Sequence, residues 1–472
     1  MSAGAEKNSV ISPEIHSLTY SLDRTSPPHA SPLGRIAFPP SAKQTILGGA
    51  TKIRVVENRK TPIVTLNLVF RAGAALDGAL PGLADFTTNL LTKGTARRSA
   101  TEIAEEADFV GSSLNAFSGV DASFIGFGTL TKNLPVMLDL MSDVLLHPSF
   151  PDEEVERWRE LQTADLLQAK SDANYLASTR TAREVYGVHP YGAAVTEESL
   201  RGITAAHCRE YYNKYIVPGN AFIIAAGDVD AAGITAQLEQ ALAAWERRGS
   251  AISPLQETAK TSVRKVCIVE RRGAVQSSIR IAQPGIARNN KDYIALDALN
   301  TLFGGYFSSR LNANLREGHG YTYGARSRFD SRRAGGMFAI SCDVRTEVTA
   351  QAIEEIFKEL HRIIAEPVGD EELAMMKNFV TGRYPLTIET PQQIASMLHN
   401  IELHGLPEDY FATYAARVEA LHAEDLLAAA QTYLHPDSMT IVAAGDAKEL
   451  TGALKHFGAV SVTDSNGAPI TV

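Results

Sequence analysis

The sequence predicts an α+β protein made of two homologous α/β sandwich domains, each an antiparallel-rich sheet with helices on one face. The first observation is a repeat: "YIVPGNAFIIAAGDV" from Tyr215 returns as "YLHPDSMTIVAAGDA" from Tyr433, an offset of 433 − 215 = 218 residues. "PDEEVERW" from Pro151 and "GDEELAMM" from Gly369 share that offset (369 − 151 = 218). Two separate stretches with one offset indicate a duplicated unit of about 200 residues.

The second observation is that both copies present the same order of predicted elements. Residues 52–74 and 263–285 each alternate between apolar and polar residues on either side of a polar turn, which predicts two strands in each copy. Residues 131–150 and 349–368 have helical periodicity. Each copy then closes with an apolar strand that ends in Ala-Ala-Gly-Asp. Strands followed by paired helices favour a sheet covered by helices.

Five segments follow from this pattern. Residues 1–44 are rich in Ser and Pro and are expected to form a loosely ordered N-terminal arm. The first domain is predicted over 45–246 and the second over 263–460, with a tail over 461–472. The polar stretch 247–262 contains Gly and Pro and has no periodicity, so we interpret it as a linker.

Composition excludes several functional classes. The 472 residues carry 45 Lys and Arg against 54 Asp and Glu, a formal charge of −9, so we expect no nucleic-acid partner and no anionic membrane surface. No apolar run reaches the roughly 18 residues that a membrane helix needs, so no membrane insertion is expected. The N-terminus has no signal-like apolar core, and we expect a cytoplasmic protein.

Few side chains have the spacing of metal ligands. Cys208, Cys267 and Cys342 lie far apart and form no CxxC pair, so we interpret them as reduced structural thiols. His399 and His404 are five residues apart, which does not place two ligands on one helical face.

The stretch "GLADFTTNLLTKGT", residues 82–95, predicts a short amphipathic helix with Asp85, Thr88 and Asn89 on one face. Its surroundings strongly resemble the first domain of the pitrilysin/insulysin (M16) family of zinc peptidases, whose site has the pattern His-x-x-Glu-His. The flanking Gly-Leu-Ala and Lys-Gly-Thr fix the alignment of that pattern to residues 85–89. The resemblance implies two LuxS/MPP-like domains forming a clam-shell, and it places the third ligand at Ala164 or Asp165.

These residues do not suit the family's chemistry. A catalytic zinc ion takes three strong protein ligands and a water, and a neutral Asn amide is a poor ligand for it. Thr88 has no suitable pKa for activating water. A residual site made of Asp85 and Asp165 is not expected to hold zinc, so we predict no metal and no cofactor in this chain.

A second resemblance lies in "GGYFSSRLNANLREGHGYTYGARSRF", residues 304–329, where the family has an Arg seven residues before a Tyr. Arg316 and Tyr323 match it, with Arg316 expected on the last turn of a helix and Tyr323 at the start of a strand. In the family this pair binds substrate carbonyl oxygens and the tetrahedral oxyanion. The alternative is that Arg316 caps helix carbonyls while Tyr323 is a half-buried strand aromatic.

Leu114, Asn115 and Ala116 match a family edge strand that pairs with the substrate backbone. The alternative is an ordinary edge strand without a ligand.

A chain that lacks the zinc half but keeps the Arg/Tyr half resembles one subunit of the family's two-subunit peptidases. We therefore expect a heterodimer in which a zinc-bearing M16 subunit binds the metal, Arg316 and Tyr323 act in trans, and a peptide or unfolded polypeptide is the substrate. A catalytically inert structural or assembly protein and a peptide-binding module are the alternatives. The sequence favours the first function because an inert descendant has no reason to keep both residues.

Overall fold

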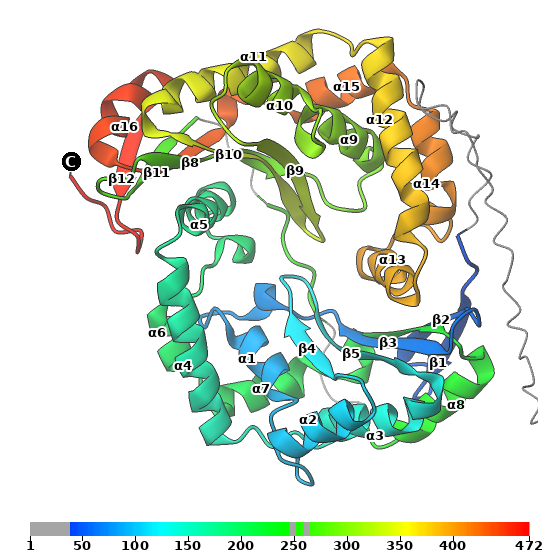
Figure 1. The fold of residues 1–472 in the computed structure, drawn as a ribbon. Helices are drawn as coiled ribbons and strands as arrows, with labels where there is room; N and C mark the ends of the chain where they lie inside the picture. Colours follow the sequence, from blue (N-terminus) through cyan, green and yellow to red (C-terminus); the bar gives the residue numbers. More distant parts are fainter. Residues whose placement is uncertain (1–37, 246–251, 259–263, 472) are drawn as a thin grey trace, which may run out of the picture. The chain divides into compact units, whose positions relative to one another are not determined.

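The computed structural model describes residues 38–245, 252–258 and 264–471. Most of the predicted arm (1–44) lies outside the described residues, and so does the predicted linker (247–262) apart from residues 252–258. The first strand begins at Ala42, within the stretch assigned to the arm. The described residues all belong to one compact unit (Figure 1).

The first half of this unit contains a six-stranded sheet with the strand order β1-β2-β6-β3-β5-β4. Its strands are β1 (Ala42–Ile46), β2 (Thr51–Glu57), β3 (Ile63–Phe70), β4 (Asn115–Ser118), β5 (Ser123–Leu130) and β6 (Ala221–Gly227). The two strands around the polar turn, β2 and β3, do not pair with each other. β6 lies between them, parallel to β2 and antiparallel to β3. Every residue of β6 is buried, which suits a central strand covered on both faces.

The second half has the order β12-β7-β11-β8-β10-β9 and repeats this topology except at one edge. There, β12 comes last in the chain and is parallel to β7, whereas β1 comes first and is antiparallel to β2. Its strands are β7 (Val266–Glu270), β8 (Gln276–Gly285), β9 (Ala325–Arg332), β10 (Gly335–Arg345), β11 (Thr440–Gly445) and β12 (Val460–Thr463). β11 takes the place of β6, between the two strands that flank the predicted turn. The predicted tail begins inside β12, which pairs with β7.

The helices follow the sequence repeat. Those of the first half are α1 (Leu83–Leu90), α2 (Ala100–Phe109), α3 (Leu134–Leu146), α4 (Asp152–Ala169), α5 (Ala173–Tyr186), α6 (Glu197–Gly202), α7 (Ala205–Tyr215) and α8 (Ala231–Ala241). Those of the second are α9 (Tyr293–Asn300), α10 (Arg310–Asn312), α11 (Thr349–Ala365), α12 (Asp370–Arg383), α13 (Pro391–His404), α14 (Tyr410–Glu419), α15 (Ala423–Tyr433) and α16 (Ala447–Leu454). α5 and α13 begin at Ala173 and Pro391, again 218 residues apart (391 − 173).

Short helical turns connect these elements. Two are π-helical, Thr301–Gly305 and Ala313–Gly318, and they flank α10. The 3₁₀ turns are Ala74–Leu76, Thr131–Asn133, Pro190–Gly192, Pro218–Asn220, Thr346–Val348, Tyr384–Thr387, Pro436–Ser438 and Lys455–Phe457. Within the described ranges we find no helix whose length and apolar character would let it span a bilayer.

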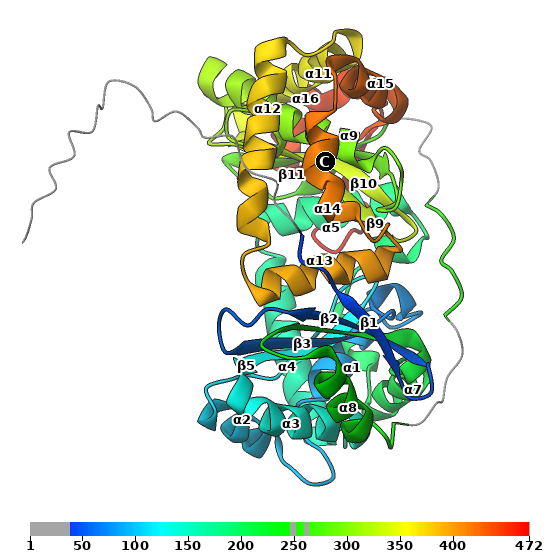
Figure 2. The ribbon, with the colours of Figure 1, turned by 90° about the vertical axis from the view of Figure 1, so that its right-hand side faces the viewer.

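Each sheet is also covered by one helix from the other half, which the sequence pattern does not predict. α5 packs against β8 and β11 of the second sheet, and α13 packs against β3 and β6 of the first (Figures 1 and 2). Leu176 and Ala177 of α5 lie in one apolar cluster with Cys267 and Val269 of β7. Because neighbouring strand residues point to opposite faces, this cluster lies on one face of β7, while Val266 and Ile268 are buried on the other.

A buried arginine joins α13 to the first sheet. The Arg54 side chain of β2 donates from Nε to Glu402 Oε1 of α13 at 2.5 Å and from both terminal nitrogens to Glu408 at 2.8 and 2.5 Å. The side chains of Arg54 and Glu402 are each only 6% exposed. Arg71, after β3, lies 3.6 Å from Glu402 Oε2. A charge removed from water in this way requires its partner, because an unpaired buried charge is costly.

Replacing Glu402 with alanine should therefore destabilise the fold. Arg54 keeps Glu408, so we expect a loss of about 2–4 kcal/mol, somewhat less than for a buried ion pair left with no partner at all. Urea denaturation measures the loss, and hydrogen exchange should show α13 opening first. The control is Glu347→Ala, which removes an exposed partner of Arg345 and should cost about 0–1 kcal/mol. Equal losses for the two variants would contradict a structural role for Glu402.

Two buried histidines of α13 should make the stability of the protein sensitive to acid. Burial lowers the pKa of His399 to about 4 and that of His404 to about 3. In the unfolded chain a histidine has a pKa of about 6.5, so below that pH the unfolded state takes up protons that the native state does not. Stability should therefore be full above pH 6.5 and should fall as the pH decreases toward 4.

The comparison is between the wild type and His399→Gln/His404→Gln, with melting temperatures recorded from pH 7 to pH 5. The double variant should lose less stability over this range, whereas exposed His147→Gln should retain the wild-type dependence. A double variant with the wild-type slope would show that these histidines are not the titrating groups.

Candidate functional site

The helix predicted around residues 82–95 is α1, and its start is fixed by a glycine and a buried aspartate. Gly82 has a φ of 103°, a left-handed conformation that favours glycine. The Asp77 carboxylate accepts hydrogen bonds from the backbone N–H groups of Gly82 and Ala84, at 2.7 and 2.8 Å. Burial raises the pKa of Asp77 to about 6, although these bonds favour its charged form. α1 is thus held in place by its own N-terminal segment.

The three degenerate zinc-site residues on α1 bind one another and nearby groups. Asn89 Nδ2 donates to Asp85 Oδ1 at 2.8 Å and to the Asp85 carbonyl at 3.0 Å. Trp158 Nε1 of α4 donates to Asp85 Oδ2 at 3.4 Å. The buried Thr88 hydroxyl donates to the Ala84 carbonyl at 2.8 Å. Burial raises the pKa of Asp85. Both carboxylate oxygens of Asp85 and the Thr88 hydroxyl therefore have hydrogen-bond partners inside the protein.

The donor set does not fit zinc. The resemblance places the third ligand at Ala164 or Asp165 of α4. Asp165 is exposed, and its side chain has no hydrogen bond within the described chain. The side chain of Ala164 has no ligand atom. Across the described ranges, no group of three or more His, Cys, Asp or Glu side chains is placed to hold a metal ion. One carboxylate bonded to an amide and an indole lacks the three strong ligands that zinc requires. We therefore assign no metal chemistry to the residues of α1.

Among the other side chains with metal-binding chemistry, Cys208 of α7 packs beside α1, in an apolar cluster with Phe86 and Leu90. Cys208, Cys267 and Cys342 are each buried free thiols. His399 and His404 lie on α13, in the contact with the first sheet.

The Leu-Asn-Ala segment lies at the edge of the first sheet. β4 follows Leu114 and pairs with β5 on one side, and no described strand pairs with its other side. Leu114 and Ala116 pack against the apolar core, while Asn115 is exposed. An edge strand of this kind leaves main-chain donors and acceptors available to an extended ligand.

Arg316 and Tyr323 lie on either side of a sharp bend. Arg316 is in the π-helical turn Ala313–Gly318, and Gly320 bends the chain with a φ of 64°. Tyr323 does not open the next strand as expected, because β9 begins only at Ala325. The Thr322 hydroxyl bonds the backbone N–H and carbonyl of Gly324, at 3.1 and 3.0 Å, and so closes a turn around Tyr323.

The surroundings of the two side chains do not match the structural alternatives. Tyr323 is 96% exposed, so it is not a half-buried strand aromatic. The Arg316 guanidinium lies 4.4 Å from the centre of the Phe307 ring and 3.4 Å from Glu317 Oε1. Within the described chain it donates no hydrogen bond to a helix carbonyl, so it is not a helix cap. Both side chains remain available to a ligand.

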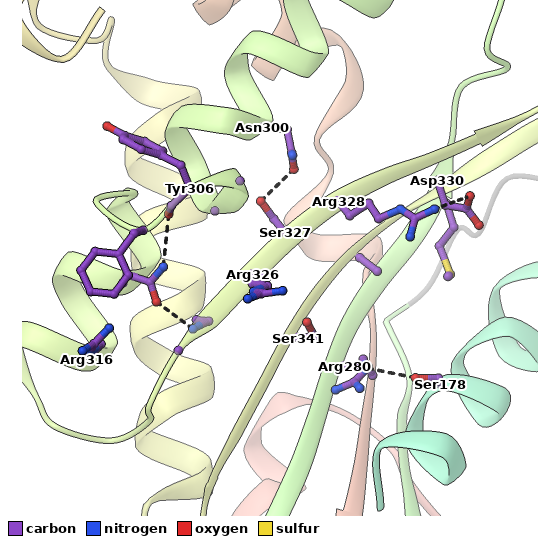
Figure 3. Close-up of a pocket in the computed structure, with 18 of the residues that line it drawn as sticks. Ser178, Arg280, Asn300, Tyr306, Arg316, Arg326, Ser327, Arg328, Asp330 and Ser341 are labelled. Carbon is purple, nitrogen blue, oxygen red and sulfur yellow. Dashed lines mark hydrogen bonds and ion pairs between the residues drawn. The ribbon is translucent and has the colours of Figure 1, made fainter. Parts of the chain in front are cut away.

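Arg316 and Tyr323 line the same pocket, which has a volume of about 910 Å³ (Figure 3). Its floor is formed by β8, β9 and β10. One wall is formed by the chain between the two π-helical turns, and another by α5 of the first half. The lining side chains include Ser178, Arg280, Tyr306, Phe307, Arg326, Arg328 and Ser341.

The sequence analysis did not identify three of these arginines. In "ARSRFD", residues 325–330, Arg326 and Arg328 alternate with residues of the core face, a period-2 pattern that could have indicated a cationic strand face. No local pattern indicates Arg280, because its place beside Arg326 depends on strand pairing across β10.

Family models match both halves of the chain. The model described as Insulinase (Peptidase family M16) matches residues 52–196, and the model described as Peptidase M16 inactive domain matches residues 202–380. An uncharacterized zinc protease of Streptomyces coelicolor is 26% identical over 365 residues, which is 75% of this chain and 79% of that protein. The non-peptidase homolog YmxG of Helicobacter pylori is 24% identical over 378 residues, 78% of this chain and 86% of that protein.

Solved structures share the fold. A peptidase M16 inactive domain from Pseudomonas fluorescens superposes with a TM-score of 0.82 at 27% identity, covering 86% of this chain and 98% of that one. A protease from Helicobacter pylori superposes with a TM-score of 0.78 at 18% identity, covering 86% of this chain and 99% of that one. Together with the duplicated sheets and the aligned α1, these matches show that the chain belongs to the M16 peptidase family.

Proposed function

We propose that this chain is the non-zinc subunit of a heteromeric M16 peptidase and that it supplies Arg316 and Tyr323 to the reaction centre of a zinc-bearing partner. The observation that carries the proposal is the contrast between the two halves. In the first half, Asp85 and Asn89 are bonded to each other, whereas in the second half both candidate side chains line an open pocket. The non-peptidase homolog among the relatives supports a chain that does not hydrolyse peptides alone.

The two side chains suit the stabilisation of negative charge on oxygen. Arg316 is a permanent cation with several N–H donors, and the Tyr323 hydroxyl is a neutral donor at pH 7. Both can donate to the carbonyl oxygen of a bound peptide, and these bonds strengthen as the oxygen becomes an oxyanion. The attacking water would be activated by the partner's metal. In this arrangement, the free side of β4 at Leu114–Ala116 would pair with the extended substrate.

A second candidate function is a peptide-binding module without turnover. It is favoured by the pocket, whose cationic lining needs no metal to hold a ligand. Addition of a zinc-bearing M16 subunit separates the candidates. Cleavage of peptide supports the first, and binding without cleavage supports the second. A stable complex that does neither points to a structural or assembly role.

Co-expression with a zinc-bearing M16 subunit tests the pair directly. In the purified complex, Arg316→Ala and Tyr323→Phe should each reduce kcat/KM for peptide cleavage by roughly 10²–10³, the usual effect of losing one oxyanion donor. The control is Arg362→Ala on α11, an exposed arginine outside the pocket, which should leave the rate within a few-fold of wild type. Unchanged cleavage in both pocket variants would refute the proposed role.

The metal content of the isolated chain gives an independent prediction. After dialysis against zinc and removal of free metal, mass spectrometry of the eluted ions should find well under one zinc per chain. A relative with an intact His-x-x-Glu-His provides the positive control. The prediction would be wrong if the wild-type chain contained one zinc ion and the Asp85→Asn variant contained none, because α1 would then hold a metal.

A further inference from the structure

The pocket beside Arg316 has a charge opposite to that of the whole protein. The chain has a formal charge of −9, yet the pocket lining contains four arginines, Arg280, Arg316, Arg326 and Arg328, and one carboxylate, Asp330. A concave surface lined by one sign of charge concentrates the electrostatic potential and attracts ligands of the opposite sign.

The pairing of the strands places three of these arginines, Arg280, Arg326 and Arg328, on one face of the second sheet. Ser341 of β10 pairs with Arg280 of β8 on one side and with Arg326 of β9 on the other. The three residues therefore form one row across the sheet, and the two arginines lie about 10 Å apart, two strand spacings. Arg328 lies two residues further along β9, about 7 Å away on the same face. Figure 3 shows Arg326 and Ser341 on the pocket floor, with Arg316 to one side and Arg280 to the other.

Arg316 and Arg328 each lie within 4 Å of one carboxylate, Glu317 and Asp330, whereas Arg280 and Arg326 form no ion pair within the described residues. Arg326 is exposed, and within the described residues its side chain forms no hydrogen bond or ion pair. Arg280 is half-buried, and its side chain donates only to neutral oxygens, among them Asn174 Oδ1 at 2.8 Å and the Ile279 carbonyl at 2.8 Å. Burial lowers the pKa of Arg280, and the nearby Asp343 carboxylate opposes this effect only in part.

The one carboxylate in the lining is already engaged. Asp330 Oδ2 lies 2.7 Å from a terminal nitrogen of Arg332, outside the pocket lining, and its Oδ1 lies 3.3 Å from Arg328. Asp330 therefore cannot neutralise the other arginines. The surplus positive charge is available to an acidic ligand.

We propose that this pocket binds acidic peptide segments in extended conformation, with Asp or Glu side chains two residues apart meeting Arg326 and Arg328. The proposal names the substrate class of the function proposed above and rests on it for the peptide nature of the ligand. Side chains at i and i+2 of an extended peptide have the same spacing as Arg326 and Arg328 along β9, about 7 Å. Arginines distributed over such a distance suit several carboxylates better than one compact anion.

The wall of the pocket supports the same class of ligand. Tyr306, Phe307 and Tyr323 belong to the lining, and the Phe307 ring lies 4.4 Å from the Arg316 guanidinium. A volume of about 910 Å³ is far larger than a single phosphate requires. Aromatic rings next to guanidinium groups offer apolar contact to the rest of a peptide chain. Arg326 and Arg328 would then select acidic residues near the Arg316 and Tyr323 pair.

The test uses the isolated chain and fluorescence anisotropy. The probe is a labelled peptide with alternating Glu residues, compared with the same peptide carrying Gln at those positions. The acidic peptide should bind at least about tenfold more tightly, and added salt should weaken it. Arg326→Gln/Arg328→Gln should reduce its affinity about tenfold or more, because two charge-assisted contacts are lost. Both arginines are exposed, so an unchanged melting temperature is expected for the variant.

The matched control is Arg59→Gln/Arg362→Gln, which removes the same net charge from exposed positions outside the pocket. Equal weakening by the two double variants, or equal affinity for the Glu and Gln peptides, would overturn the proposal. Saturable binding of inorganic phosphate at concentrations where the acidic peptide does not bind would assign the pocket to small anions instead and would also overturn it. Because binding is measured without a partner, a failed cleavage assay would refute the proposed function and leave this result standing.

Discussion

The reciprocal exchange of helices α5 and α13 is the constraint on which the rest of this structure depends. Arg54 and Glu402 hold α13 of the second half against the first sheet, and the apolar side chains of α5 cover the second sheet. The same exchange builds the pocket, because Ser178 and Thr181 of α5 line a cavity whose floor belongs to the second half. The candidate site is therefore a product of both copies of the repeat, although Arg316 and Tyr323 come from one.

The two copies differ in how the polar side chains of their candidate sites are paired. In the first, hydrogen bonds from Asn89 and Trp158 engage both oxygens of Asp85, so this carboxylate is paired within the protein. In the second, Tyr323 and Arg326 extend into a pocket without protein partners for their polar groups, in the part of the chain that the structure describes. Buried polar groups are normally paired, while exposed unpaired ones are common at binding sites. Side chains whose donors remain free for a ligand are therefore found at the pocket.

Much of the fold could be predicted because a repeat and hydrophobic periodicity are local properties of the sequence. The helix at α1, the helices α3 and α11, and the strands around both polar turns were predicted from such patterns. The insertion of β6 between β2 and β3 was not, because periodicity indicates that a face is buried and not which segment buries it. For the same reason, the row formed by Arg280, Ser341 and Arg326 could not be predicted, because it depends on how the strands pair. Arg316 and Tyr323 could be predicted as site residues because their motif is local, and their role stays a prediction.

The position of β6 has a consequence for the synthesis of the chain. β2 and β3 leave the ribosome early, but their common neighbour begins at Ala221, and α13, which covers that sheet, begins only at Pro391. The strands of the first sheet are complete only when β6 has been made, up to Gly227, and the face that α13 covers stays open until His404 has been made. Contacts of such long sequence separation slow folding and leave apolar strands exposed in the nascent chain. Either copy of the repeat taken alone would lack the helix of the other copy that covers one face of its sheet.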